Sequence, residues 1–141
     1  MIRYLLDTNV VSELTRPEPD AKVARWLGQL SFMTLPAVGI YEIAFGIQQL
    51  QVGKRRKFLE DWFAELLISA CDVLPFDRDA ALSCAVLDWE ARRRGRTVEQ
   101  RDLFILAIAK SQNLALATRN VAHFRGFGVP VYDPFGDVQF L

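Results

Sequence analysis

The sequence has 141 residues, which is the length of one domain of common size and too short for two ordinary domains. Hydrophobic residues make up 51% of the chain and charged residues 24%, a balance that is typical of globular proteins and excludes a disordered chain. Lys and Arg number 17, as do Asp and Glu, so the composition excludes a chain coated in positive charge for non-specific nucleic-acid binding. We expect residues 1–141 to form a single domain.

No segment of the sequence is suited to crossing a membrane. The longest apolar run, 103–109, is far shorter than the about 20 residues that span a bilayer. Asp7 interrupts the apolar start of the chain before it reaches the length of a signal peptide. Cys71 and Cys84 are too few for a disulfide framework, so we expect buried, reduced thiols. These features predict a cytoplasmic protein with no membrane partner.

Short apolar runs alternate with longer helical segments along the chain. The runs lack strict polar–apolar alternation, which indicates parallel strands buried on both faces. The predicted strands are 2–6, 32–35, 73–76, 114–117 and 129–132. The predicted helices are 20–30 after an Asp20 N-cap, 38–52 ended by Gly53, 54–68, a long one from Asp77 or Asp79 to Arg94 ended by Gly95, and 99–112. This order predicts an α/β fold with a central, mainly parallel β-sheet flanked by α-helices.

Several kinds of catalytic site are absent from the sequence. His123 is the single histidine, and no second His or Cys stands at metal-ligand spacing, which argues against a zinc site. The sequence has neither a Gly-x-Ser-x-Gly nucleophile elbow nor a glycine-rich phosphate-binding loop. We therefore interpret His123 as a packed or exposed loop residue, and we do not expect a nucleotide cofactor or nucleophilic catalysis.

Three acidic residues stand where the active sites of α/β proteins form. Asp7 directly follows the first predicted strand, and ligands of open α/β sheets bind outside the carboxyl ends of the strands. A helix N-cap is the alternative role for Asp7. Glu42 lies in an almost wholly apolar helical stretch, and Asp102 opens a helix that is apolar all round. Structural alternatives stay open for both: an exposed Glu paired with a Lys or Arg, and a satisfied charge at a helix start.

Polar residues also follow the strand predicted at 114–117. Thr118 and Asn120 place a hydroxyl and an amide at its carboxyl end, where they can reach the same crevice as the acids. Three carboxylates gathered there would repel one another, which raises their pKa values. A divalent cation offsets this repulsion, and hard oxygen ligands select Mg²⁺ or Mn²⁺ over zinc.

Taken together, these motifs resemble the PIN domain, and more narrowly the VapC/FitB-type ribonuclease toxins of prokaryotic toxin–antitoxin pairs. The resemblance covers residues 2–135 and is carried by Asp7-Thr8-Asn9, Glu42, Asp102 before an Ile-Leu-Ala-Ile-Ala helix, and Thr118-Arg119-Asn120. It implies a PIN-like single domain and a Mg²⁺-dependent endoribonuclease, with Mn²⁺ as a substitute. Asp7, Glu42 and Asp102 match the family's catalytic, metal-binding acids.

The resemblance also implies supporting residues and partners. Asn9, Thr118 and Asn120 would orient a carboxylate or a metal-bound water. Asn120 stands where the family often has a fourth acid, which favours one metal ion over two. The implied partners are an RNA substrate, a VapB/FitA-like antitoxin and a second copy of the chain in a homodimer. In the family, helices in the region of residues 59–68 bind antitoxin or the second copy, and core packing is the alternative here.

Two basic clusters, 54–57 and the run Arg92, Arg93 and Arg94, interrupt a neutral chain. Each can bind RNA phosphates, or it can serve only to solvate a helix end and compensate its dipole. The three tryptophans, Trp26, Trp62 and Trp89, stand at helical positions among apolar residues, which predicts that they lie in the core or in an interface.

Three other functions compete with the nuclease. A haloacid-dehalogenase-type phosphatase also places an Asp after its first strand, but it requires a second Asp two residues later, where this chain has Asn9. A phospho-acceptor receiver domain requires an acidic pair that is absent here. A PIN-like scaffold that binds RNA or protein without nuclease activity agrees with Asn120 in place of an acid.

Overall fold

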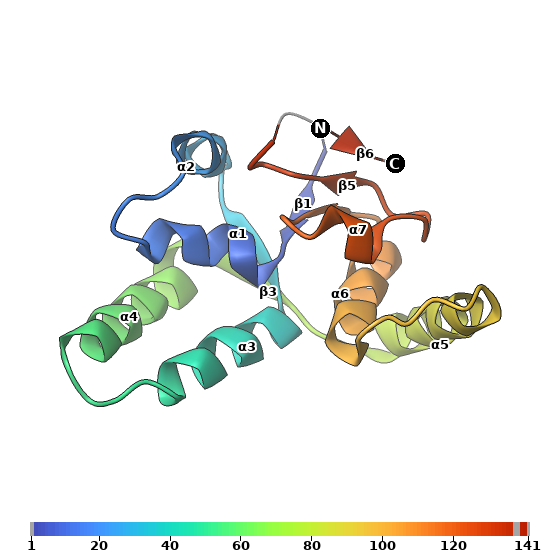
Figure 1. Cartoon of the computed structure of the whole chain (residues 1–141), viewed down its shortest axis with the longest axis horizontal. Helices are drawn as coiled ribbons and strands as arrows, with labels where there is room; N and C mark the ends of the chain where they lie inside the picture. Colours follow the sequence, from blue (N-terminus) through green and yellow to red (C-terminus); the bar gives the residue numbers. More distant parts are fainter. Residues whose placement is uncertain (1, 137–138, 141) are drawn as a thin grey trace.

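The structure is a computed structural model that describes residues 2–136 and 139–140. Its strands are β1 (Tyr4–Leu6), β2 (Met33–Pro36), β3 (Cys71–Leu74), β4 (Ala115–Ala117), β5 (Val131–Tyr132) and β6 (Gln139–Phe140). One sheet has the order β1-β4-β5-β6, in which only β6 is antiparallel to its neighbour, and β2 and β3 form a parallel pair beside β1 (Figure 1). The predicted α/β fold with a mainly parallel sheet is confirmed.

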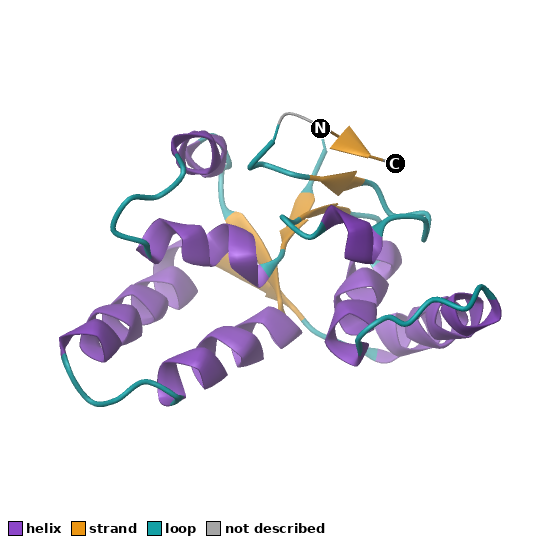
Figure 2. Ribbon diagram, in the orientation of Figure 1, coloured by secondary structure: helices purple, strands orange, loops and turns teal. Residues whose placement is uncertain are grey.

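Helices cover the strands on both sides (Figure 2). The helices are α1 (Thr8–Ser12), α2 (Ala21–Gly28), α3 (Ala37–Gln48), α4 (Lys54–Glu65), α5 (Arg78–Arg93), α6 (Gln100–Ser111) and α7 (Val121–Phe124). A 3-10 turn, Glu13–Thr15, follows α1, and a π-helical turn, Leu66–Ala70, follows α4. In Figure 1, α1 to α4 lie on one side of the strands and α5 to α7 on the other.

Successive residues of the central strands enter two different cores. Leu5 packs with α5 and α6, whereas Leu6 packs with α1 and α2. Leu116 and Ala117 of β4 divide between the same two clusters. Since side chains alternate along a strand, β1 and β4 bury both faces, as the continuous apolar runs predict.

The strand predicted at 73–76 begins two residues earlier and is not buried on both faces. Cys71 pairs with Met33 at the start of β3, and the pairing ends at Leu74, before Pro75, which has no N–H to donate. Val73 is exposed because β3 pairs only with β2 and forms the edge of its sheet.

The predicted caps are confirmed, and two helices end three or four residues earlier than predicted. Asp20 caps α2, Asp77 caps α5, and Gly95 ends α5 in the left-handed region at φ +68°. The helix predicted to reach residue 52 ends at Gln48, and the helix predicted to reach residue 68 ends at Glu65. In the first, the exposed segment 49–53 forms a loop. In the second, the chain widens into the π-helical turn Leu66–Ala70, which leads into β3.

Both cysteines are free thiols, Cys84 buried and Cys71 half-buried. Burial, with a smaller effect of the Asp72 charge, raises the pKa of Cys71 to about 11. Trp26 packs against Tyr4 and Tyr132, whereas Trp89 is exposed. Among the residues that the structure describes, no helix is both long and apolar enough to span a membrane.

Candidate active site

Asp7 caps α1 and lies at the carboxyl end of β1. It follows β1, and its N–H donates a 2.9 Å hydrogen bond to the Ala117 carbonyl of β4. Its Oδ1 accepts from the N–H of Thr8 at 2.8 Å, which caps α1. Its Oδ2 accepts from the Thr118 hydroxyl at 2.8 Å and from the Asn9 amide at 3.4 Å. Asp7 is therefore a buried carboxylate fixed by two strand ends and one helix start.

Burial raises the pKa of Asp7, because the charged form loses its hydration. The hydrogen bonds from Thr118 and Thr8, and the His123 charge, lower this pKa but do not cancel the effect of burial.

Glu42 lies on α3, half-buried, and is linked to Asp7 through Thr8. The Thr8 hydroxyl donates to Glu42 Oε1 at 3.2 Å, while the Thr8 N–H donates to Asp7. Burial raises the pKa of Glu42; the Thr8 hydrogen bond lowers it, repulsion from Asp7 raises it, and the Arg101 charge lowers it. A helical Glu exposed beside a basic residue was the alternative; Glu42 is half-buried and bonded to Thr8 of α1, and Arg101 is the basic residue near it.

Asp102 lies in the first turn of α6, half-buried, with its Oδ2 at 3.4 Å from His123 Nδ1. Burial raises the pKa of Asp102, repulsion from Asp7 raises it further, and the His123 charge lowers it.

The three acids lie within electrostatic range of one another, since Asp7 and Asp102 each raise the pKa of Glu42 and Asp7 raises that of Asp102. Within residues 2–136 and 139–140, however, no three His, Cys, Asp or Glu side chains form a ready-made metal-binding set. The structure thus brings the predicted acids to one region without closing them into a coordination cage.

The predicted supporting residues divide into three kinds of contact. Thr118 is fully buried and contacts Asp7 directly. Asn9 contacts Asp7 and also accepts from the Arg119 N–H at 3.2 Å. Asn120 contributes its N–H, which donates to the Thr118 hydroxyl oxygen at 3.0 Å.

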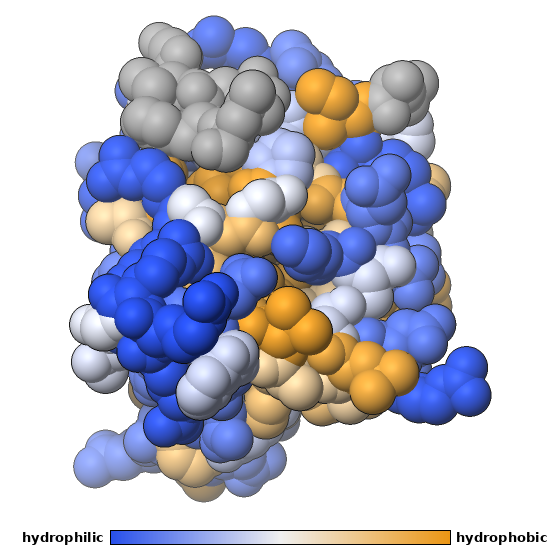
Figure 3. Space-filling model, turned by 90° about the vertical axis from the view of Figure 1, so that its right-hand side faces the viewer, coloured by the Kyte–Doolittle hydropathy of each residue, from blue (hydrophilic) through white to orange (hydrophobic). Residues whose placement is uncertain are grey.

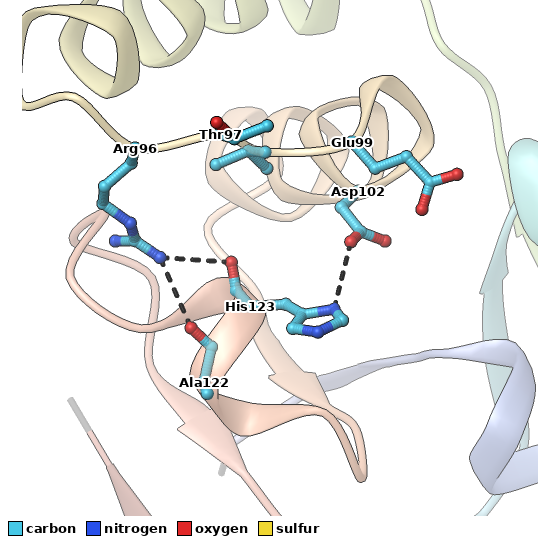
Figure 4. Close-up of a pocket in the computed structure, with 7 residues that line it drawn as sticks. Arg96, Thr97, Glu99, Asp102, Ala122 and His123 are labelled. Carbon is cyan, nitrogen blue, oxygen red and sulfur yellow. Dashed lines mark hydrogen bonds and ion pairs between the residues drawn. The ribbon is translucent and has the colours of Figure 1, made fainter.

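His123 lies on α7 beside Asp102 and not in a loop, which corrects the interpretation made from sequence. Both residues line a pocket of about 500 Å³ together with Arg96, Thr97 and Glu99 (Figure 4). The Arg96 guanidinium donates to the carbonyls of Ala122 and His123 and so holds α7 in place. His123 could have been found from its position, because it stands three residues after Asn120, and Asn120 follows the carboxyl end of a central strand.

The arginine run at the end of α5 has structural contacts. Arg92 pairs with Asp88 at 2.8 Å. Arg94 donates to the Gly126 carbonyl at 2.9 Å and stacks on the Phe127 ring. Arg93 is exposed. These contacts agree with a helix-end role, and RNA binding by Arg92, Arg93 and Arg94 stays a prediction.

The fold is an α/β domain with a mainly parallel sheet, and Asp7 and Thr118 lie at the carboxyl ends of two of its parallel strands. The PIN domain family matches residues 4–126, and the chain belongs to that family.

Its relatives match over most of both chains. The chain is 34% identical to Toxin FitB of Neisseria gonorrhoeae over 94% of this chain and 99% of that protein. It is 33% identical to VapC ribonuclease Y4jK of Sinorhizobium fredii, over 93% and 96%. Its fold superimposes on the crystal structure of FitAcB from Neisseria gonorrhoeae with a TM-score of 0.86, at 32% identity over 94% and 98% of the two chains.

Proposed function

We propose that this chain is a Mg²⁺-dependent endoribonuclease and the toxin of a toxin–antitoxin pair acting in the cytoplasm. The observation that carries the proposal is the hydrogen-bonded link of Asp7 and Glu42 through Thr8, with Asp102 near enough to Asp7 for repulsion between the two to raise the pKa of Asp102. RNA as the substrate and the toxin role are supported by relatives named VapC ribonuclease and Toxin FitB.

The donor set fits a hard divalent cation. All three acids offer oxygen, and the cost of their mutual charge falls when a cation neutralises it. Mg²⁺ keeps several waters and is bound through one or two carboxylates, so a closed cage of three is not needed. We assign Asp7 and Asp102 to hold Mg²⁺, directly or through water, and Mn²⁺ suits the same oxygens.

A bound cation supplies Lewis-acid polarisation of the phosphodiester and a more acidic water. Glu42 would orient the attacking water. Thr8 engages its Oε1, and Oε2 would accept the water proton as the new P–O bond forms, while the bond to the leaving strand breaks and the leaving oxygen takes a proton from solvent water. Thr118 and Asn9 keep the Asp7 oxygens aimed at the site.

We propose that a VapB/FitA-like antitoxin and a second copy of the chain are its protein partners. On α5, Leu82, Val86 and Trp89 are spaced by four and three residues and are 63%, 56% and 63% exposed. Figure 3, which views the molecule from the side of α5, shows apolar surface between hydrophilic patches.

Asp79 and Arg93 lie on α5 at equal sequence distance on either side of Val86, so antiparallel pairing of two copies would place unlike charges opposite one another. Val86→Arg should then convert a dimer to a monomer in analytical ultracentrifugation.

The test of the nuclease is incubation of the purified chain with RNA and Mg²⁺, repeated with EDTA. We expect cleavage that EDTA abolishes and that Asp7→Asn and Asp102→Asn abolish, while Asp61→Asn, an exposed acid on α4, retains it. Phosphate release from small esters in place of RNA cleavage would support a phosphatase. Binding of RNA without cleavage would support a scaffold.

A further inference from the structure

Two side chains, an exposed aromatic ring and an arginine, lie beside the candidate site. Each directly precedes one of the three acids in the sequence. Tyr41 precedes Glu42 on α3, and Arg101 precedes Asp102 on α6. Arg101 Nη2 donates to the Tyr41 hydroxyl oxygen at 3.1 Å, and its guanidinium carbon lies 4.8 Å from the Tyr41 ring centroid. The two helices are thus joined at the rim of the site by a stacked pair.

This pair contributes little to the core. Tyr41 is 52% exposed, and Phe45, one turn further along α3, contacts it edge-on and is 47% exposed. Exposed rings bury little apolar area and therefore stabilise the fold weakly. Contacts with the Phe45 ring and the Arg101 guanidinium nevertheless limit the rotation of the Tyr41 ring, which favours binding because little side-chain freedom is lost.

We propose that Tyr41 and Arg101 form a stacking subsite that holds one unpaired nucleobase of the RNA next to the scissile phosphodiester. The inference rests on the proposed nuclease function and adds the place where one base of the bound RNA is held. Proteins recognise single strands by stacking unpaired bases on aromatic rings and on guanidinium planes, and both are present here.

Charge and hydrogen bonding favour a nucleic acid at this position. Arg101 is close enough to Glu42 for its positive charge to act on that carboxylate, so it offsets part of the negative potential that a phosphodiester meets on entering. The Tyr41 hydroxyl oxygen accepts from Arg101, which leaves its own hydrogen available to a polar group of the RNA.

The experiment measures the affinity of fluorescently labelled single-stranded RNA by anisotropy with Mg²⁺, in an Asp7→Asn background to prevent cleavage. We expect Tyr41→Ala to weaken binding roughly five- to hundredfold, the range for loss of one base–aromatic contact, and Tyr41→Trp to restore it. Phe58→Ala is the matched control, because Phe58 is 51% exposed beneath Arg55 on α4, which carries none of the three acids.

An abasic scan identifies the base. Removing one base near the cleavage site should weaken RNA binding by the protein that retains Tyr41. The same removal should not weaken RNA binding by the Tyr41→Ala variant any further. Equal RNA affinity of Tyr41→Ala and of the protein that retains Tyr41 overturns the subsite. If Tyr41→Ala instead changes the oligomeric state and leaves RNA affinity unchanged, Tyr41 belongs to a protein interface and the subsite is also overturned. Failure of the native protein, with Asp7 intact, to cleave RNA at all is a separate result that overturns the proposed function.

Discussion

The buried hydroxyl of Thr118 donates a 2.8 Å hydrogen bond to Asp7, a residue 111 positions earlier in the chain. The bond joins the ends of two adjacent parallel strands, β1 and β4, where the backbone of Asp7 is already bonded to Ala117. Thr118 in turn accepts from the Asn120 N–H, so its single oxygen connects the strand end to the start of α7. The orientation of the Asp7 carboxylate therefore depends on a residue at the other end of the domain.

Thr118→Val keeps the shape of the side chain and removes this hydrogen bond. Asp7 then loses a donor to a buried carboxylate, and the Asn120 N–H loses its acceptor. We expect a loss of about 1–3 kcal/mol in the free energy of unfolding, the cost of an unsatisfied buried polar group. Urea denaturation measures it. Thr118→Ser, which retains the hydroxyl, should stay within about 1 kcal/mol of the native protein, and an equally large loss there would show that packing and not the hydrogen bond is responsible.

Asp7→Asn should abolish RNA cleavage without unfolding the domain. Asn is as good a helix N-cap as Asp, so α1 keeps its cap, and the substitution removes a charge that burial disfavours. We expect the melting temperature without metal, measured by circular dichroism, to be no lower than that of the native protein. A collapse of the melting temperature would mean that the Asp7 charge is needed for the fold.

Stability without metal should fall as the pH rises. The pKa values of Asp7, Glu42 and Asp102 are raised above their ordinary values, so the folded state binds these protons more tightly than the unfolded state. Their contribution is complete below the ordinary values, 3.8 for Asp and 4.5 for Glu, and is lost as the pH rises through the raised values.

Mg²⁺ should reverse this loss, because ionised carboxylates bind it and protonated ones do not. The gain in melting temperature from Mg²⁺ over EDTA should be larger near about pH 8 than near about pH 5. A gain that is the same at both pH values, or that persists in Asp7→Asn, would place the cation elsewhere.

Arg96 should control the mobility of α7. Its guanidinium donates to the carbonyls of Ala122, His123 and Arg125 and lies 4.3 Å from the Phe127 ring centroid. Arg96→Met keeps the apolar stem and removes the donors, so amide hydrogen exchange should rise in residues 121–126. Arg93→Met, three residues earlier in the chain, should leave exchange there unchanged. Equal exchange in both variants would show that α7 is held by its apolar contacts.

The fold was predictable because its strongest signals are local. The apolar runs of β1 and β4, the Asp20 and Asp77 caps and the Gly95 stop each depend on neighbouring residues. The start of β3 depends on pairing with Met33, which is a tertiary contact, and local hydrophobicity placed that strand two residues late. The short helices α1 and α7 leave no periodic pattern to detect.

The candidate site was predictable as a set of residues and not as a set of contacts. Asp7, Glu42 and Asp102 stand out as acids at strand ends and in apolar helices. The link from Thr8 to Glu42, the approach of His123 to Asp102 and the pairing of Arg101 with Tyr41 join segments from different parts of the chain. Such contacts follow from how α1, α3, α6 and α7 pack, which no single stretch of sequence specifies.

The proposal that Asp7 and Asp102 hold one cation is tested most directly by measuring Mn²⁺ binding, with electron paramagnetic resonance detecting the free ion. We expect the native protein to bind Mn²⁺, Mg²⁺ to displace it, and Asp7→Asn and Asp102→Asn each to weaken binding by about tenfold or more, as loss of a ligand does. Asp61→Asn should bind as the native protein does. Unchanged Mn²⁺ affinity in both Asp7→Asn and Asp102→Asn would contradict a cation held between these two carboxylates.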